Sequence, residues 1–358
     1  MITLARKANN ALKFAQAWRH NLGYKLGRLD VTVSARCNAR CMMCNVWKLD
    51  KQAREKMGSE LSFNEIAKVL TEAAEAGVSS IFLSGGEPLM RPDIIDIVAF
   101  ARSLNISAVL FTNGLLLSEE KAQQLIEAGL GGIAVSLDSP EPGLHDEIRG
   151  VKGLWQRAVD GLKHMQQVKL ARGLIAPTIH LHSLVTKRSL QNLAAMSELA
   201  ENLGVDGVVY LPLINKTAKA GSDFGLDEKD YSVLAGLPGF VKPGHYKNHL
   251  CLEPWFKLTM DPFGEIYPCC FAMPFQNADD SLQNTFWGDS DRFSLGNVRD
   301  SSLLDIWNGE AMRAFRGQLH EPPQFSMCRW CNYLPREPFC KLEGILKTIP
   351  QTNQRDAI

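Results

Sequence analysis

The chain has no net charge and no long apolar run. Its 39 Lys and Arg residues balance its 39 Asp and Glu residues, which argues against nucleic acid as a partner held by charge. No apolar run reaches the roughly 20 residues that span a bilayer. Residues 1–27 also lack the apolar stretch and cleavage site of a secretory signal. We therefore predict a cytoplasmic protein with no membrane span and no nucleic-acid partner.

Cysteine is absent from a long middle part of the chain and is concentrated on either side of it. The nine cysteines form two groups, namely Cys37, Cys41 and Cys44, then Cys251, Cys269, Cys270, Cys328, Cys331 and Cys340. A secreted protein usually spreads an even number of cysteines along the chain. Tight groups in a chain without a secretory signal indicate metal ligation in a reducing compartment.

Between residues 29 and 211, short apolar runs alternate with amphipathic stretches. The runs predict strands at Asp30–Val33, Ser80–Leu83, Ala108–Phe111, Gly132–Ser136, Thr178–Leu184 and Gly207–Leu211. The stretches predict helices at Phe63–Ala76, Pro92–Leu104, Ser118–Ala128, Leu154–Val168 and Ser189–Leu203. Such βα units give a parallel sheet, either open and doubly wound or curved into a partial barrel. In both, function gathers at the carboxyl ends of the strands.

The flanks of this region differ from it. Residues 1–28 carry apolar residues at helical spacing, including Trp18, and predict an N-terminal helix packed on the main domain, which we place at residues 29–228. Asn215–Asp230 is polar and has the composition of a linker. Residues 229–358 form a Cys-rich C-terminal domain with one clear helix, at Ser302–Leu319. A domain this rich in loops usually needs a metal or a disulfide to fold.

The first cysteine group places three thiolates on one loop. An iron–sulfur cube has four iron corners, so three ligands leave one iron open for a substrate or cofactor. Zinc prefers four ligands, and a catalytic zinc site more often includes His or a carboxylate. The residues between these cysteines offer neither, which favours iron over zinc.

The spacing Cys37-x3-Cys41-x2-Cys44 resembles the signature of the radical S-adenosylmethionine (SAM) superfamily. Ser84-Gly85-Gly86-Glu87-Pro88, after the second predicted strand, resembles its GGE motif. One residue departs from the pattern: Met43 stands where the family usually has an aromatic residue. The resemblance implies an α/β fold with a partial (β/α)6 barrel, in which SAM lies across the strand ends and binds the open iron of a [4Fe–4S] cluster.

The same resemblance implies which residues contact SAM. The backbone at Gly85 and Gly86 would allow close approach, and Glu87 would help to fix the amine. Ser136 and Asp138 are candidates for ribose and carboxylate contacts, or they cap a loop. Arg149 is a candidate partner of the SAM carboxylate, or it forms a surface ion pair.

The second cysteine group resembles the SPASM and twitch extensions of radical SAM enzymes, which hold auxiliary iron–sulfur clusters. Six cysteines are too few for two fully ligated cubes. The resemblance therefore implies one auxiliary [4Fe–4S] cluster on Cys251, Cys269, Cys328 and Cys331, with structural zinc on the same four as the alternative. Cys270 and Cys340 are left over, either as buried thiols or as a hydrogen-atom donor to a substrate radical or a replacement ligand.

The resemblance also suggests a class of substrate. Enzymes with a single auxiliary cluster that this chain resembles suggest dehydrogenation of a small polar, sugar-like or aminocyclitol-like metabolite. Only 36 residues precede Cys37, too few for a leader-binding domain of the kind that peptide-modifying members often carry. Epimerisation, modification of a ribosomal peptide and a non-enzymatic zinc module are the alternatives. An electron donor such as a flavodoxin or ferredoxin would be the protein partner.

Candidate substrate residues lie on the fifth and sixth predicted strands. His180 and His182 are two residues apart and so share one face; a histidine there is a candidate acceptor of a substrate hydroxyl proton. The alternative is that both point toward the helices. Tyr210 on the sixth strand is a weaker candidate of the same kind.

Overall fold

The computed structural model describes residues 2–44, 46–48, 59–213, 224–226, 228–234, 251–273 and 293–320. Its strands are β1 (Arg28–Ser34), β2 (Ser80–Gly85), β3 (Ser107–Thr112), β4 (Gly132–Ser136), β5 (Thr178–Val185), β6 (Gly207–Pro212), β7 (Lys257–Met260), β8 (Glu265–Tyr267) and β9 (Gly296–Asn297). Its α-helices are α1 (Ile2–Arg19), α3 (Phe63–Glu75), α4 (Ile94–Ser103), α5 (Glu119–Glu127), α6 (Pro142–Arg149), α7 (Leu154–Ala171), α8 (Leu193–Asn202), α9 (Glu228–Leu234), α10 (Leu303–Asn308) and α11 (Glu310–Gly317).

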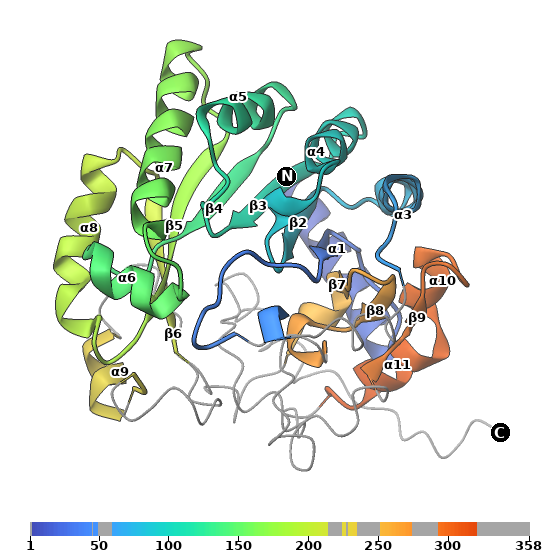
Figure 1. Cartoon of the computed structure of the whole chain (residues 1–358). Coiled ribbons are helices and arrows are strands. Elements are labelled where there is room, and N and C mark those ends of the chain that lie inside the picture. The colour runs from blue at the N-terminus through green and yellow to red at the C-terminus, as the bar shows by residue number, and fades with distance from the viewer. Residues whose placement is uncertain are drawn as a thin grey trace.

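The strands form one sheet in the order β6-β5-β4-β3-β2-β1-β7-β8-β9. Strands β1 to β6 all run parallel, as the alternating sequence predicts, and helices cover one of their faces (Figure 1). The prediction of an α/β fold with a partial barrel is confirmed. Because the strands are parallel, the loops that follow them meet at one edge.

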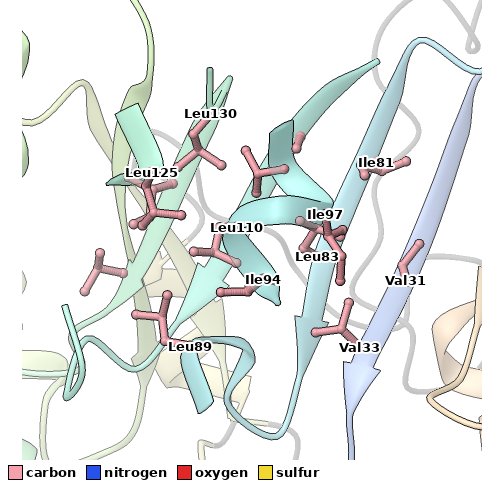
Figure 2. Close-up of a cluster of buried hydrophobic side chains, with 14 of the residues drawn as sticks. Val31, Val33, Ile81, Leu83, Leu89, Ile94, Ile97, Leu110, Leu125 and Leu130 are labelled. Atoms are coloured by element: carbon pink, nitrogen blue, oxygen red, sulfur yellow. The ribbon is translucent and has the colours of Figure 1, made fainter. Parts of the chain in front are cut away.

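The core lies between the sheet and these helices. Val31, Ile81, Leu83 and Leu110 alternate along their strands and are almost fully buried against helix residues such as Ile97 (Figure 2). The residues between them point to the opposite face, here called the inner face, which carries polar and aromatic side chains instead. Because side chains alternate between the two faces of a strand, every second residue of these strands faces inward and could contact a substrate or cofactor.

The C-terminal segment does not stand apart from the barrel sheet. Strand β7 pairs in parallel with β1, with Arg28 opposite Lys257 and Val31 opposite Met260, and β8 and β9 follow in antiparallel order. These strands were not predicted from the sequence. The single helix predicted at Ser302–Leu319 is wrong, because Gly309 adopts an extended backbone (φ −67°, ψ 166°) that divides it into α10 and α11.

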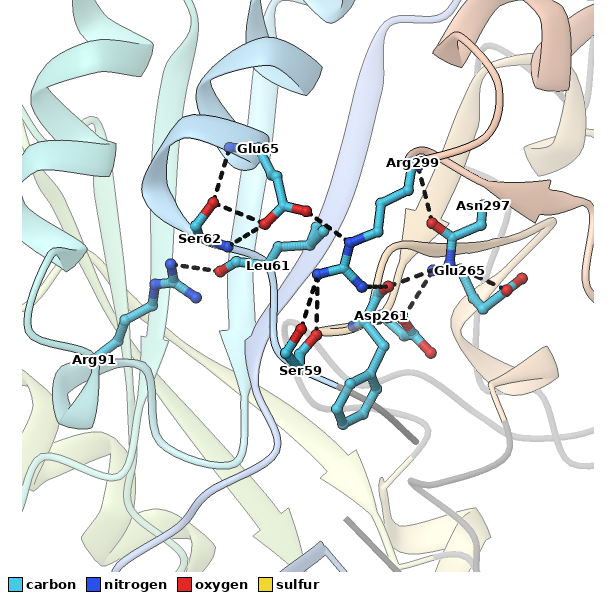
Figure 3. A network of polar contacts seen from close by, with 10 residues as sticks. Ser59, Leu61, Ser62, Glu65, Arg91, Asp261, Glu265, Asn297 and Arg299 are labelled. Atoms are coloured by element: carbon cyan, nitrogen blue, oxygen red, sulfur yellow. Dashed lines mark hydrogen bonds and ion pairs between the residues drawn. The ribbon is translucent and has the colours of Figure 1, made fainter. Parts of the chain in front are cut away.

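A polar network fixes the C-terminal segment to helix α3 (Figure 3). Ser62 and Glu65 form a capping box at the start of α3, and the second oxygen of Glu65 accepts a hydrogen bond from Nε of Arg299 at 2.6 Å. Arg299 also donates to the carbonyl oxygens of Ser59 and Phe263. This side chain, from the second residue after β9, therefore joins the start of α3 to the β7–β8 turn.

Helix α1 also packs on the C-terminal segment. Trp18 stacks on Trp255 with ring centroids 4.4 Å apart, and Phe14 stacks on Phe256 at 5.3 Å. Both side chains on α1 are at most 5% exposed. The N-terminal helix is present as predicted, but these two side chains pack on the C-terminal segment rather than on the main domain. Within the described residues, no helix is both long enough and apolar enough to cross a membrane.

Candidate functional site

The first cysteine group lies on the loop that follows β1, at the edge where the carboxyl ends of the strands meet. Cys41 is buried, whereas Cys37 and Cys44 are half-buried. The loop, residues 35–44, runs between the end of β2 on one side and the end of α6 on the other. We call it the cysteine loop.

On the β2 side, the GGE motif holds the cysteine loop through its backbone. The amide of Gly86 donates to the carbonyl oxygen of Ser34 at 2.8 Å, and the amide of Glu87 donates to that of Arg36 at 2.8 Å. A Cβ atom on Gly86 would clash with the Arg36 carbonyl, and one on Gly85 would lie 2.5 Å from that of Ser34. The absence of side chains at Gly85 and Gly86 therefore lets the cysteine loop pack against them. Close approach of SAM to these two residues stays a prediction.

The Glu87 carboxylate is fully buried and bonded within the protein. It accepts hydrogen bonds from the Thr112 hydroxyl at 2.6 Å and from the amides of Leu89 and Asn113. Burial raises the pKa of Glu87, and these three donors oppose the rise. The Asn113 side chain in turn donates to Asn38 on the cysteine loop at 2.8 Å. Glu87 thus positions the loop, and its contact with the amine of SAM stays a prediction.

On the α6 side, the loop meets the last turn of the helix. The amides of Arg40 and Met42 donate to the carbonyl oxygens of Arg149 and Ile148, both at 3.0 Å. Gly150 ends the helix in the left-handed conformation (φ 66°), and a Cβ there would lie 2.5 Å from the Arg40 carbonyl oxygen. A glycine is required for both reasons.

The Arg149 side chain forms a two-bonded ion pair with Asp138. Its Nε and Nη2 atoms lie 2.6 and 2.7 Å from the two carboxylate oxygens, and its Nη1 lies 3.9 Å from Sγ of Cys41. The side chains are 13% and 0% exposed, so the alternative of a surface ion pair is wrong. Burial opposes the charge of Arg149, yet Asp138 and Cys41 together raise its pKa.

Three supporting residues carried no recognisable motif. Glu60 accepts hydrogen bonds from the Ser34 hydroxyl and the Ala35 amide at the start of the cysteine loop. Asn113 directly follows β3, and its side chain donates a hydrogen bond to Asn38 on the cysteine loop. His145 accepts the Asp138 amide on Nδ1 at 3.1 Å, while its Nε2 is buried and has no hydrogen-bond partner among the described residues. All three contacts join segments that are far apart or lie in loops, where spacing gives no signal.

The thiols suit an iron–sulfur cluster better than a single ion. In the described part of the chain, no three His, Cys, Asp or Glu side chains are arranged to hold one metal ion. Three thiolates on one loop suit a cube, in which each binds a different iron and the fourth iron stays open. Burial raises the pKa of Cys37 to about 12, and the nearby Cys41 and Glu87 add to this. Bound iron would supply the positive charge that a buried thiolate needs.

The inner face carries the two predicted histidines. His180 and His182 alternate with the buried Ile179 and Leu181, so they point away from the helices. His182 packs edge-on against Phe111 at 5.1 Å. Burial, with the charges of His180 and Arg149, lowers the pKa of His182 to about 4. His182 is therefore a neutral group able to donate or accept a hydrogen bond, and a weak base.

Two other predicted residues lie at different positions in the fold. Ser136, the last residue of β4, pairs with His182 in the sheet register and therefore belongs to the inner face beside it. The Tyr210 hydroxyl lies 2.9 Å from that of Ser197 on α8. Tyr210 thus points toward the helices, and its prediction as a substrate residue is wrong.

The second cysteine group is described only in part. Cys251, Cys269 and Cys270 are half-buried, whereas Cys328, Cys331 and Cys340 lie outside the described residues. The predicted set of four ligands, Cys251, Cys269, Cys328 and Cys331, therefore stays a prediction. Cys251, Cys269 and Cys44 pack against the same apolar group, which contains Phe14, Trp18, Val46, Leu252, Trp255, Tyr267, Ala272, Met273, Phe315 and Leu319. The two cysteine groups therefore border one apolar core.

Cys270 lies near a buried set of charges. Lys257 pairs with Asp30 at 3.1 Å and with Glu253 at 3.0 Å. Burial raises the pKa of the Cys270 thiol, although the Lys257 ammonium opposes the shift. The geometry places Cys270 inside the protein and leaves its predicted role in hydrogen donation a prediction.

Comparison with known protein families gives two matches. The model of the radical SAM superfamily matches residues 31–200, and that of the SPASM iron–sulfur cluster-binding domain matches residues 251–332. The first match contains the cysteine loop and the GGE motif. The second contains Cys251, Cys269, Cys270, Cys328 and Cys331 but not Cys340.

Individual relatives cover most of the chain. A PqqA peptide cyclase of Methylocella silvestris is 30% identical over 319 residues, which is 83% of this chain and 77% of the relative. An Fe-coproporphyrin III synthase of Methanosarcina barkeri is 30% identical over 353 residues, or 87% and 84%. Among solved structures, Streptococcus suis SuiB bound to its precursor peptide SuiA has a TM-score of 0.65 at 17% identity, covering 96% of this chain and 74% of that one.

Proposed function

Because the chain belongs to the radical SAM superfamily and carries a SPASM domain, we propose that its radical chemistry modifies a peptide. The protein binds SAM, a [4Fe–4S] cluster and an auxiliary iron–sulfur cluster. When bound, the first cluster supplies the electron that cleaves SAM to a 5′-deoxyadenosyl radical, which abstracts a hydrogen atom from a substrate carbon.

The residues of the chain would divide this work. Cys37, Cys41 and Cys44 hold the cluster, and the backbone of Gly86 and Glu87 holds their loop in place. We place the radical SAM domain at residues 29–228 and the auxiliary domain at residues 229–358, with an auxiliary cluster on Cys251, Cys269, Cys328 and Cys331. The inner face, where His180 and His182 lie, would receive the substrate.

Sequence similarity supports a peptide as the substrate. The PqqA peptide cyclase shares 30% of its residues with this chain over most of both lengths, and further PqqA peptide cyclases resemble it at 26–29%. These relatives favour peptide modification over the sugar-like or aminocyclitol-like substrate that we expected. By analogy, the product would be a peptide that has lost two hydrogen atoms and gained one internal bond. One hydrogen would leave as an atom that converts the 5′-deoxyadenosyl radical to 5′-deoxyadenosine, and the other would leave as a proton and an electron, for which the auxiliary cluster would be an acceptor.

A porphyrin is the second candidate substrate. The Fe-coproporphyrin III synthase is also 30% identical to this chain and covers a larger share of it. Two AdoMet-dependent heme synthases resemble the chain at 27% and 30%. Both substrate classes fit a radical that attacks an unactivated carbon, so a direct assay has to separate them.

The test uses protein purified without oxygen and reconstituted with iron and sulfide. It is incubated with SAM and dithionite, together with either a synthetic PqqA peptide or Fe-coproporphyrin III, the latter offered as a porphyrin that a heme-synthase activity would modify, and 5′-deoxyadenosine is measured alongside the mass of the substrate. We expect the peptide to lose two hydrogen atoms and to raise 5′-deoxyadenosine above the substrate-free level. The Cys41→Ala variant, which lacks one proposed ligand, should abolish both signals.

The outcomes separate the alternatives. A change in mass only in the porphyrin would overturn the peptide proposal and favour the second candidate. Formation of 5′-deoxyadenosine without a change in either substrate would leave the radical chemistry and refute both substrate classes as tested. Zinc in place of iron, with no nucleoside formed, would contradict the enzymatic function itself.

A further inference from the structure

The Asp138–Arg149 pair contacts the cysteine loop, which suggests a role for it besides binding SAM. Arg149 presents three nitrogens, and Asp138 takes two of them, Nε and Nη2, with one carboxylate oxygen each. This fork fixes the plane of the guanidinium, since both of its bonds are short and nearly equal. The remaining nitrogen, Nη1, is thereby directed at Sγ of Cys41, 3.9 Å away.

Asp138 is itself held from two sides. Its Oδ1 accepts the amide of Leu184 at 2.9 Å, and its own amide donates to His145. Burial lowers the pKa of His145 to about 4, so the imidazole adds no charge at neutral pH. Asp138 therefore has no freedom to turn away from Arg149, and the guanidinium is anchored beside the sulfur.

Cys41 differs from Cys37 in having a positively charged donor beside its sulfur. The donors near Cys37 are neutral: the Ala39 amide at 3.4 Å and the Asn113 side chain at 4.0 Å. The donor beside the Cys41 sulfur is instead a cation. A buried cation acts strongly on a neighbouring charge because little solvent screens it.

We propose that Arg149, aimed by Asp138, is a positioning residue that raises the reduction potential of the SAM-binding cluster through the Cys41 sulfur. This rests on the proposed ligation of that cluster by Cys37, Cys41 and Cys44, and it is independent of the substrate. Reduction adds one negative charge to the cluster. A fixed guanidinium next to a ligating sulfur stabilises that charge, as hydrogen bonds and charges around a metal site do in general. The carboxylate of Asp138 acts in the opposite sense and limits the rise.

The side chain can be changed without removing the backbone contacts that hold the loop. The Arg149 carbonyl, rather than its guanidinium, accepts the Arg40 amide. The Arg149→Gln variant therefore removes the charge and keeps the loop bonded to α6. Asp138→Asn keeps an oxygen for the Leu184 amide and removes the opposite charge.

The experiment is a potentiometric titration without SAM or substrate, followed by electron paramagnetic resonance. The cluster whose signal changes when SAM is added afterwards is the SAM-binding one, and the auxiliary cluster serves as an internal reference. The matched control is Arg188→Gln, which removes the same charge from a two-bonded pair with Glu147 on the same helix, where both side chains are at least 41% exposed.

We expect Arg149→Gln to lower the ratio of reduced to oxidised cluster at a fixed potential by at least about tenfold, which is about 59 mV for one electron. Asp138→Asn should move the potential upward, and Arg188→Gln should leave it unchanged. An unchanged potential in Arg149→Gln, or a downward shift in both site variants, would overturn the proposal.

Two measurements keep this test separate from protein stability and from the proposed function. If Arg149→Gln fails to bind iron, Arg149→Lys decides, because it keeps the positive charge and loses the fork with Asp138: a potential below the wild-type value supports the proposal, and an unchanged potential refutes it. Iron content of the Cys41→Ala variant tests the ligation on which the proposal rests. A failure to modify any peptide would leave all of these potentials as predicted.

Discussion

At the scale of single residues, Gly86 is the position where the cysteine loop leaves no room for a side chain. Its Cβ would meet the Arg36 carbonyl, and this backbone cannot move without releasing Cys37. We expect Gly86→Ala to cost about 1–3 kcal/mol and to lower the iron and sulfide bound per chain. Gly143→Ala is the control, since no atom lies within 4 Å of a Cβ placed there. Full iron content in Gly86→Ala would contradict this account of the motif.

His145 gives the protein a dependence on pH that one residue can test. Burial lowers its pKa from the ordinary 6.5 to about 4, so the unfolded chain binds the proton first. Neutral His145 therefore leaves the free energy of unfolding at its full value above pH 6.5. As the pH falls from 6.5 toward 4, this free energy decreases by up to about 3 kcal/mol. We expect melting temperatures of the wild type and of His145→Asn to diverge in this window. Parallel curves would refute the assignment.

The sequence identified the ligands of the site better than their supports. Cys37, Cys41 and Cys44 follow a spacing, and Gly85 to Glu87 follow a motif, so both could be read directly. Glu60 and His145 act through contacts that only the folded chain creates. An ion pair was one alternative for Arg149, but its burial and its partner Asp138 were not predicted, because the contact exists only in the folded chain.

At the scale of elements, all six strands of the barrel and five of the six described α-helices between them were predicted within a few residues. Long periodic segments carry a strong signal. Helix α6 was missed because it is eight residues long, and β7 because its four residues are all buried and do not alternate. Strand β7 exists through its pairing with β1, which lies more than 200 residues earlier in the chain and which no local pattern shows.

The link between α3 and the C-terminal strands depends on Arg299. Its three kinds of partner lie on Glu65, Ser59 and Phe263, and we expect Arg299→Ala to lower the free energy of unfolding by about 1–2 kcal/mol. Arg172→Ala, which breaks an exposed pair with Glu127, should change it by less than about 0.5 kcal/mol. Urea unfolding of both variants measures the difference, and equal losses would contradict a linking role for Arg299.

At the scale of the whole molecule, the two ends of the described chain support each other. Trp18 on α1 is 5% exposed and stacks on Trp255 from the C-terminal segment. Removing the ring in Trp18→Ala should cost about 3–5 kcal/mol. Leu12→Ala on the same helix is the control, because Leu12 is 66% exposed. We expect thermal unfolding to show a lower melting temperature only for Trp18→Ala; an equal melting temperature for both would mean that α1 adds no stability.

Because β7 pairs with β1, part of the sheet can form only late during synthesis of the chain. Lys257 on β7 is bonded to Asp30 on β1, 227 residues earlier. At a translation rate of about 5–20 residues per second, the second partner of β1 emerges roughly 10–45 s after β1 itself. Throughout this interval the strand leading into the cysteine loop has one open edge, the kind of surface on which strands of other chains add. The yield of folded protein therefore depends on how well the nascent chain is shielded until its late strands arrive.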